Sequence, residues 1–189
     1  MIDLLRRKLA AYQPASMDSN KRARASVLIP ILESVKGMHI LLTKRTEKVK
    51  YHKNEISFPG GMYEENDGDS LATAVRESME EVGLRKGDVE ILGRLDDMST
   101  FTGFVITPYV GLIPFPYEFV LNPDEVSYLI YLPLVYLLAS EPTIESADFE
   151  GRQKNAPAIY YEGERIWGAT CRILLQFRKI LQDRQDEKV

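Results

Sequence analysis

The chain has 189 residues, of which 44% are hydrophobic and 28% charged, a composition that fits one folded domain and argues against disorder. The net charge of −4 argues against a nucleic acid partner, and the lack of a long uninterrupted apolar run argues against a transmembrane helix or a membrane partner. The single cysteine, Cys171, excludes an intramolecular disulfide and a multi-cysteine zinc site, and it favours a cytoplasmic location.

The first part of the chain predicts an extension followed by a hairpin. Residues 1–11 predict a short amphipathic helix and residues 13–24 a polar linker, so residues 1–24 are expected to precede the main domain. Two β-leaning runs at 26–32 and 38–43, joined through Lys36-Gly37, predict the two strands of a hairpin.

A short strand at 56–58 is expected to stop at Pro59-Gly60-Gly61. The helix that follows is expected from about residue 71 to residue 82, with Asp69 or Ser70 as its N-cap and Gly83 just beyond its C-terminus.

The second half is expected to contain strands at 89–95 and 105–113, two short pieces within 125–138, a hairpin at 158–167 and a helix at 169–182. Pro133 splits the apolar segment, because proline is not tolerated inside a helix. Strands that come first and last, with one helix between them and one at the end, predict an α+β fold.

The predicted helix at 71–82 carries three glutamates on one face. If Glu77 is set at zero, Glu80 falls at about −60° and Glu81 at about +40° on a wheel of about 100° per residue. The residues expected on the opposite face, packed on a sheet, are Leu71, Val75, Met79 and Val82.

Clustered carboxylates repel one another in a cleft unless a cation lies between them, and hard oxygen ligands suit Mg²⁺ or Mn²⁺. The alternative is an acidic helix surface that simply faces water. Two neighbouring features favour the cation: Arg76 can orient a carboxylate, and Gly60-Gly61 permits close approach of the backbone.

Gly61 followed by Arg76-Glu77, Glu80-Glu81 and Gly83-Leu84 resembles the signature box of the Nudix hydrolases. That family cleaves diphosphate bonds in nucleoside diphosphates linked to another group. The resemblance implies a Nudix-like α/β/α sandwich, with a mixed sheet between helices, over residues 25–183, followed by a polar tail at 184–189.

The resemblance also implies site roles. Metal ligands would be Glu77, Glu80, Glu81 and Gly61, holding Mg²⁺ or Mn²⁺. Arg76 would orient the acids, and one of Glu77, Glu80 or Glu125 would activate the attacking water. For Glu125, which lies outside the box, a plain acid in the first turn of a helix is an equal alternative.

The box departs from the common pattern in its spacing and at one residue. Eight residues, one more than usual, separate Asp67 from Arg76, and Ser78 stands at a position that is commonly apolar. The extra residue also occurs in the coenzyme A pyrophosphatase branch of the family. Asn54 stands where that branch usually has glycine, and asparagine tolerates the left-handed backbone better than most residues.

Flanking residues resemble the same branch, in Leu41-Leu42-Thr43-x-Arg45-Thr46, in His52-x-x-x-Ile56-x-Phe58-Pro59-Gly60-Gly61 and in Ile166-Trp167-Gly168-Ala169-Thr170. The resemblance implies hydrolysis of coenzyme A, or a derivative, to 3′,5′-adenosine diphosphate and 4′-phosphopantetheine. The residues assigned to the substrate are Lys44, Arg45, His52, Phe58 and Gly60.

The basic segment 44–53 could steer a polyanionic substrate, although a solvated basic loop is the plain alternative. Stacking on adenine is open to Phe101, Phe104, Tyr109 and Tyr128, but most of these are expected to fill the core. Asp96 and Asp97 form a weaker candidate pair of acids.

Two other functions stay open. One is the same chemistry on ADP-ribose or another nucleoside diphosphate derivative, and the other is a non-catalytic nucleotide-binding module on the same fold. The expected partner is a small molecule, and a homodimer is an assembly open to the chain.

Overall fold

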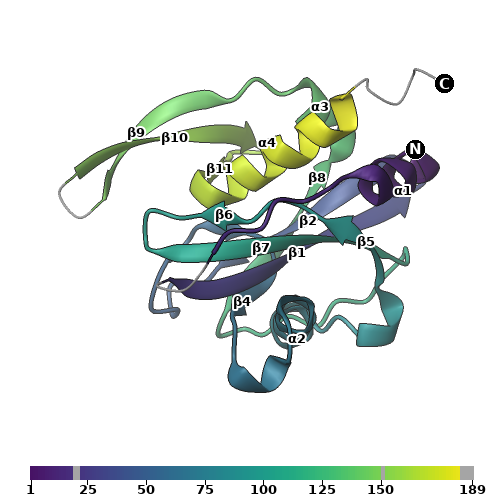
Figure 1. The fold of residues 1–189 in the computed structure, drawn as a ribbon, viewed down its shortest axis with the longest axis horizontal. Helices are drawn as coiled ribbons and strands as arrows, with labels where there is room; N and C mark the ends of the chain where they lie inside the picture. Colours follow the sequence, from purple (N-terminus) through teal and green to yellow (C-terminus); the bar gives the residue numbers. More distant parts are fainter. Residues whose placement is uncertain (19–21, 150–151, 184–189) are drawn as a thin grey trace.

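The structure is a computed structural model that describes residues 1–18, 22–149 and 152–183, so the predicted tail at 184–189 lies outside the described residues. A large mixed sheet lies between helices (Figure 1). Helix α2 (Ser70–Val82) lies on one side of it, and α1 (Ile2–Ala11) and α4 (Gly168–Gln182) lie on the other. The predicted α+β class, with a mixed sheet between helices, is confirmed.

The larger sheet is organised around the predicted hairpin. Its strands β1 (Ala23–Ser34) and β2 (Gly37–Arg45) pair antiparallel, with Ile31 opposite Ile40. Strand β7 (Phe104–Ile113) runs parallel to β1, and the predicted strands at 89–95 and 105–113 are confirmed as β5 (Glu90–Arg94) and β7. With β3 (Ile56–Ser57) at one end, the order is β3-β2-β1-β7-β5, and β8 (Val126–Pro133) also pairs with β2, outside this order.

The Pro59-Gly60-Gly61 segment differs from the prediction. Strand β3 (Ile56–Ser57) does end before it, but the glycines then begin strand β4 (Gly60–Met62), which pairs antiparallel with β1. A β-carbon on Gly60 would lie 2.4 Å from the carbonyl oxygen of Ser26, so glycine is what allows this close pairing.

The later elements follow the prediction with one omission. Pro133 separates β8 (Val126–Pro133) from α3 (Leu134–Ala139), as expected. The predicted hairpin is β10 (Arg152–Tyr161) with β11 (Glu164–Trp167). Strand β9 (Thr143–Phe149), which pairs with β10 in the smaller sheet, was not predicted, and the short strand β6 (Met98–Ser99) was also missed.

Apolar residues pack on both sides of the larger sheet. The side of α1 and α4 is the larger core, and Leu5, Leu9 and Cys171 are buried in it. The side of α2 includes Leu28, Leu41 and Val82. Within the described residues, no helix is long and apolar enough to cross a membrane.

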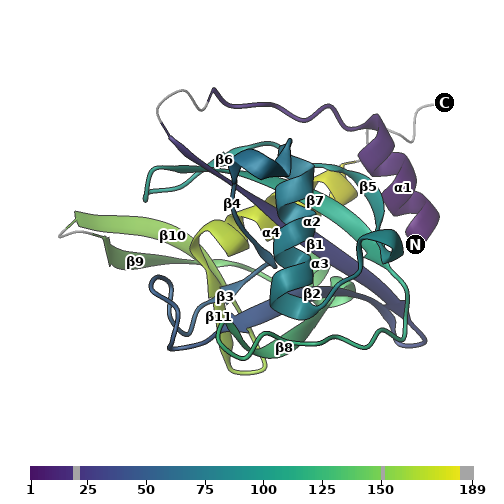
Figure 2. The same cartoon turned by 90° about the horizontal axis from the view of Figure 1, so that it is seen from below.

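The buried face of α2 is rotated from the prediction. Met79 was expected to pack on the sheet but is 45% exposed, whereas Glu81 is only 1% exposed. The small side chains of Ala74 and Ser78 are fully buried and let the helix approach the sheet there. The inward arc therefore runs from Glu81 through Ala74 and Ser78 to Val82, and one glutamate is carried into the interior. Figure 2 shows α2 lying over the strands of the larger sheet.

Candidate active site

Helix α2 is fixed at both ends. The Asp69 side chain accepts a hydrogen bond from the Ala72 amide at 2.7 Å, and Gly83 ends the helix in the left-handed conformation with φ of 69°. Both predicted cap positions are confirmed. Beyond the helix, the amide of Asn122 donates to the carbonyl of Glu81 at 2.9 Å, so the segment before β8 is tied to the last turn of α2.

Glu81 is a buried carboxylate with a donor on each oxygen. The Gly60 amide donates to Oε2 at 3.3 Å, and the Arg45 guanidinium donates to Oε1 at 3.4 Å. The pKa of Glu81 is raised to about 8, mainly by burial and also by the nearby carboxylates of Glu125 and Glu77, against the lowering effects of Arg45 and the Gly60 amide. Three acids therefore act on one another at this point.

Glu77 lies against the backbone of Gly61. A β-carbon on residue 61 would lie 2.3 Å from the carboxylate carbon of Glu77, so the glycine makes room for the acid. Burial also raises the pKa of Glu77, while Arg76, which donates to its Oε1 at 3.0 Å, lowers it. The glycine and the glutamate that the sequence motif separates by sixteen positions are in direct contact.

Arg76 is bound through several of its donors. It contacts both carboxylate oxygens of Asp67, at 2.7 and 3.1 Å, and the carbonyl oxygen of Met62 at 3.0 Å. The Arg76 guanidinium holds the pKa of Asp67 well below its usual range, and Asp67 in turn raises the pKa of Arg76. These contacts hold Arg76 in one position, and its hydrogen bond to Glu77 orients that carboxylate.

Glu80 and Glu125 lie at the margin of this cluster. Glu80 has a side chain that is 55% exposed and pairs with Arg76 at 3.2 Å. Glu125 accepts a hydrogen bond from the Asn122 side-chain amide at 3.1 Å, and its charge acts on both Glu77 and Glu81. The alternative of an acidic surface facing water therefore describes Glu80 but does not describe Glu81.

The donor set suits a hard divalent cation, although the acids are tied to other donors in this structure. Within the described residues, no group of three or more His, Cys, Asp or Glu side chains is gathered as a metal site. The charges of Glu77 and Glu125 nevertheless act on the buried carboxylate of Glu81. Burying several negative charges together is costly in free energy unless a cation compensates them. The residues present fit Mg²⁺ or Mn²⁺ in chemical type.

The predicted substrate residues divide into two groups. Arg45 and Gly60 contact Glu81, as described above. Lys44 instead points to the opposite side of β2 and pairs with Glu164 at 2.7 Å, because neighbouring residues of a strand face opposite ways. His52 lies in the loop before β3 and contacts Glu55 at 2.9 Å, a hydrogen bond that raises the pKa of the imidazole.

Phe58 is a correction to the prediction. Its ring is 2% exposed and belongs to the larger core, so its side chain is not available to a ligand in this structure. Asn54, in the same loop, has φ of 58°, so asparagine does adopt the left-handed backbone expected at that position.

The aromatic and acidic candidates outside the box have other contacts. The Tyr109 hydroxyl lies 2.8 Å from Ser70 Oγ, and the Tyr128 hydroxyl donates to Glu164. Phe101 remains exposed, with Lys154 over its ring. Asp96 accepts hydrogen bonds from Tyr12 and Ala15 at 2.8 Å each, which ties the N-terminal segment to the domain.

Asp97 also holds the N-terminal segment against the domain. It accepts hydrogen bonds from the Met17 amide at 2.9 Å, from Thr107 at 2.8 Å and from Arg94 at 3.1 Å. The pair of acids therefore anchors chain that the sequence had indicated as a linker.

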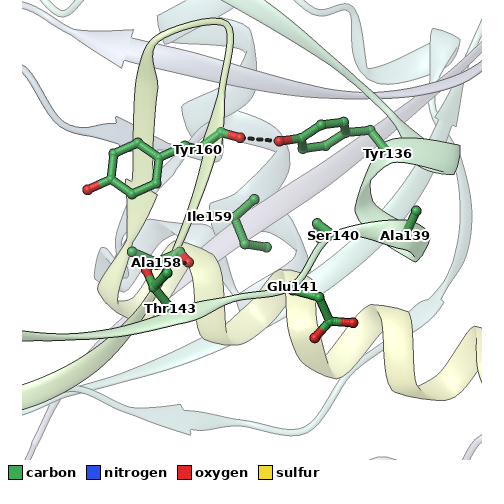
Figure 3. Close-up of a pocket in the computed structure, with 8 residues that line it drawn as sticks. All are labelled: Tyr136, Ala139, Ser140, Glu141, Thr143, Ala158, Ile159 and Tyr160. Carbon is green, nitrogen blue, oxygen red and sulfur yellow. Dashed lines mark hydrogen bonds between the residues drawn. The ribbon is translucent and has the colours of Figure 1, made fainter.

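Two surface hollows lie away from the glutamates. One, of about 360 Å³, is formed by the end of α3 and by β9 and β10, with Tyr136, Glu141 and Tyr160 among its lining residues (Figure 3). The other, of about 410 Å³, lies between β8 and the turn that joins β10 to β11. Neither is lined by residues of α2.

Sequence reasoning missed two contributors to the site. Asp67 was recognised as the acid of the box, but its pairing with Arg76 was not inferred, although an acid just before a helix and an arginine within it are a signal for such a pair. Asn122 carries no motif, and its role depends on how the chain returns to α2, which local patterns do not reveal.

Comparison with protein families gives a match to the NUDIX domain over residues 22–153. The chain is 33% identical over 170 residues to the uncharacterized Nudix hydrolase NudL of Photorhabdus laumondii, covering 89% of this chain and 90% of that protein. It is 36% identical over 153 residues to NudL of Yersinia pestis, covering 80% of this chain and 76% of that protein.

Solved structures share the fold at low sequence identity. The NUDIX domain of Shewanella oneidensis NrtR, complexed with ADP ribose, superimposes with a TM-score of 0.51 at 20% identity, over 70% of this chain and 84% of that one. A Caenorhabditis elegans Ap4A hydrolase gives 0.51 at 17% identity, over 59% of this chain and 80% of that one.

Proposed function

The chain belongs to the Nudix hydrolase family, and we propose that it hydrolyses the diphosphate bond of coenzyme A or one of its derivatives with the help of Mg²⁺ or Mn²⁺. The observation that carries this proposal is the buried carboxylate of Glu81, which lies beneath Gly60 and close enough to Glu77 and Glu125 for their charges to raise its pKa.

The ligand set follows from this arrangement. Glu77 and Glu81 would be the principal ligands of the cation, with Glu80 as a further ligand and the backbone of Gly61 beside Glu77. When bound, the cation would neutralise charge on the diphosphate and favour ionisation of the attacking water. Arg76, fixed by Asp67, keeps Glu77 in position for this role.

The reaction needs a base for the attacking water. Glu125 is suited to the task, because it comes from outside the helix and is oriented by a neutral amide, Asn122, rather than by an arginine. It would take one proton as the water oxygen attacks phosphorus in line and the bond to the bridging oxygen breaks. Glu77 and Glu80 are the other candidates for this proton.

The choice of coenzyme A is supported by the resemblance of the flanking motifs to the coenzyme A pyrophosphatase branch, which includes Arg45, while Asn54 departs from it by standing where that branch usually has glycine. The left-handed conformation at Asn54 keeps that loop in the form a glycine would give it. Arg45 and Gly60 both contact Glu81, and we propose them as the main contacts to the substrate. Lys44 and His52 would contribute charge from greater distance.

Competing substrates in one reaction test the proposal. Coenzyme A, acetyl coenzyme A, ADP-ribose and a dinucleoside polyphosphate are incubated together with Mg²⁺, and the products are separated and identified. We expect 3′,5′-adenosine diphosphate and 4′-phosphopantetheine, or its acyl form, to appear fastest. Preferential cleavage of ADP-ribose or the dinucleotide would replace coenzyme A by the alternative substrate, and no cleavage of any of them would favour a binding module.

The assembly and the location are part of the same proposal. We infer a homodimer formed along β8, which within the described residues pairs only with β2 and carries no charged side chain from Val126 to Pro133. Light scattering after size exclusion would test it, and a monomer at micromolar concentration would contradict it. A cytoplasmic location is supported by the single cysteine, which is buried.

A further inference from the structure

Arg45 occupies an unusual place beside the candidate metal ligands. It is at an irregularity in the pairing of β2 with β8, where the register shifts between Lys44 and Arg45. The extra residue is in β8, since Lys44 is opposite Tyr128 and Arg45 is opposite Val126, so the alternation of side chains along β2 is kept. The Arg45 side chain is 22% exposed and reaches Glu81 on the side of the sheet that α2 covers.

The guanidinium of Arg45 is poorly satisfied there. Its contact with Glu81 is 3.4 Å long, whereas hydrogen bonds between arginine and carboxylate are usually about 2.7–2.9 Å. Its Nε is buried and, within the described residues, has no acceptor. A buried arginine donor without an acceptor is costly, so this side chain has hydrogen-bonding capacity that an anion could use.

Glu81, in turn, accepts one hydrogen bond on each carboxylate oxygen. Oε2 receives the amide of Gly60, which is fixed because β4 pairs with β1 through Val27. Oε1 receives Arg45 through a long contact from a flexible side chain. A divalent cation on Oε1 would be repelled by the positive charge of the Arg45 guanidinium beside it, and Arg45 is the donor that can leave without moving a strand.

Arg76 shows what a fixed arginine at the same site looks like. It contacts both oxygens of Asp67 and the carbonyl of Met62, in addition to Glu77 and Glu80. Those contacts hold it in one position. The two arginines beside the glutamates therefore differ in how firmly they are held, and only Arg45 is free to change partner.

We propose that Arg45 is an exchangeable partner of Glu81, whose guanidinium donates to the side chain of Glu81 until a divalent cation binds, then leaves Glu81 and pairs with a phosphate of the substrate. The inference rests on the proposed function, since it takes Glu81 as a ligand and a diphosphate as substrate. Without a cation, Arg45 would position the side chain of Glu81. With the cation and the substrate bound, it would contact a phosphate of the substrate.

The exchange predicts how the cation stabilises the protein in the absence of any substrate. In the wild-type protein the cation must displace Arg45, whereas in Arg45→Met it enters a site whose competitor is gone. The rise in Tm between EDTA and saturating Mg²⁺ is expected to be larger in R45M by about 2–4 °C. All variants are measured in one buffer at one pH, so that the difference between the two rises depends on the substitution alone.

Arg165→Met is the matched control. Arg165 forms an ion pair with Glu145 at 2.6 Å in the smaller sheet, away from α2. R165M should lose some stability but show the same cation-induced rise as the wild-type protein. Arg45→Gln is measured beside R45M, so that a folding failure of one neutral variant leaves the other.

A second measurement tests whether Arg45 binds a phosphate group once the cation is present. With Mg²⁺ present, inorganic pyrophosphate should raise the Tm of the wild-type protein further, and this additional rise should be largely lost in R45M and R45Q. An equal or smaller Mg²⁺-induced rise in the neutral variants, or an undiminished effect of pyrophosphate, would overturn the exchange. If the wild-type protein shows no rise with Mg²⁺ or Mn²⁺, the proposed metal site fails as well, which separates the two conclusions.

Discussion

Gly61 and the carboxylate of Glu77 are so close that a β-carbon on residue 61 would come within 2.3 Å of the carboxylate. The contact joins β4 to α2 at the point where the acids gather. Glycine is needed at this position because a larger side chain would occupy the space of the Glu77 carboxylate, and not because the backbone needs to be flexible there.

Gly61→Ala should displace Glu77 and lower the hydrolysis rate by about 100-fold, because misplacing a reacting group by an ångström has a cost of that order. The matched control is Gly87→Ala, since a β-carbon on Gly87 meets nothing within 4 Å. Rates with Mg²⁺ are compared for both variants. Full activity in G61A would show that Glu77 tolerates displacement.

Much of this arrangement could be predicted, because the signals are local. The caps of α2 at Asp69 and Gly83 and the break at Pro133 each depend on backbone geometry that one residue type fixes. The fold class followed from the order of strands and helices.

The errors came from contacts between distant segments. The wheel could not show that Ala74 and Ser78 would bring the helix closest to the sheet, so it placed Met79 inward and left Glu81 on an acidic face. Phe58 looked like part of a binding motif, but the core takes its ring. Strand β9 has an exposed Ile144 and little apolar alternation, so its pairing with β10 gave no local signal.

The pKa of Glu81 predicts a pH dependence of stability in the metal-free protein. The folded pKa of about 8 lies above the usual 4.5, so between these values the folded state holds a proton that the unfolded state has released. Stability should therefore fall as pH rises from about 4.5 to 8, by up to about 1.4 kcal/mol per unit of pKa shift.

Glu81→Gln has no such proton, so its stability in EDTA should lack this decline. The measurement is the free energy of unfolding in urea at several pH values, as the difference between the two proteins. A difference that stays constant from acid to neutral pH would mean that Glu81 titrates normally.

Asp67→Asn should release Arg76 from its strongest partner. Loss of a charge-assisted pair with an almost buried carboxylate should lower the free energy of unfolding by about 1–3 kcal/mol and reduce kcat as Glu77 loses its support. Because the pKa of Asp67 lies below its usual value, this stabilisation is present above the unfolded pKa of 3.8 and is lost as pH falls through the folded pKa.

Asp88→Asn is the control for that variant, since Asp88 pairs with an exposed Arg85 on the surface. It should change stability far less and leave kcat unchanged. Equal losses in D67N and D88N would show that the Asp67–Arg76 pair has no special structural role.

Asp97→Ala should show that Asp97 anchors the N-terminal segment and has no part in catalysis. Removing its bonds to Thr107 and to the Met17 amide should cost about 1–3 kcal/mol of stability and speed amide exchange in residues 12–17. The hydrolysis rate at a temperature well below Tm should stay at the wild-type level. A fall in kcat with unchanged stability would instead assign Asp97 to the active site.

The most direct measurement is the position of a cation in crystals of the protein soaked with Mn²⁺, located by anomalous scattering. The account predicts a peak about 2.1 Å from carboxylate oxygens of Glu77 and Glu81, absent in Glu81→Gln. A fully occupied Mn²⁺ site elsewhere in a hydrolytically active crystal, with Glu81 still paired to Arg45, would contradict it.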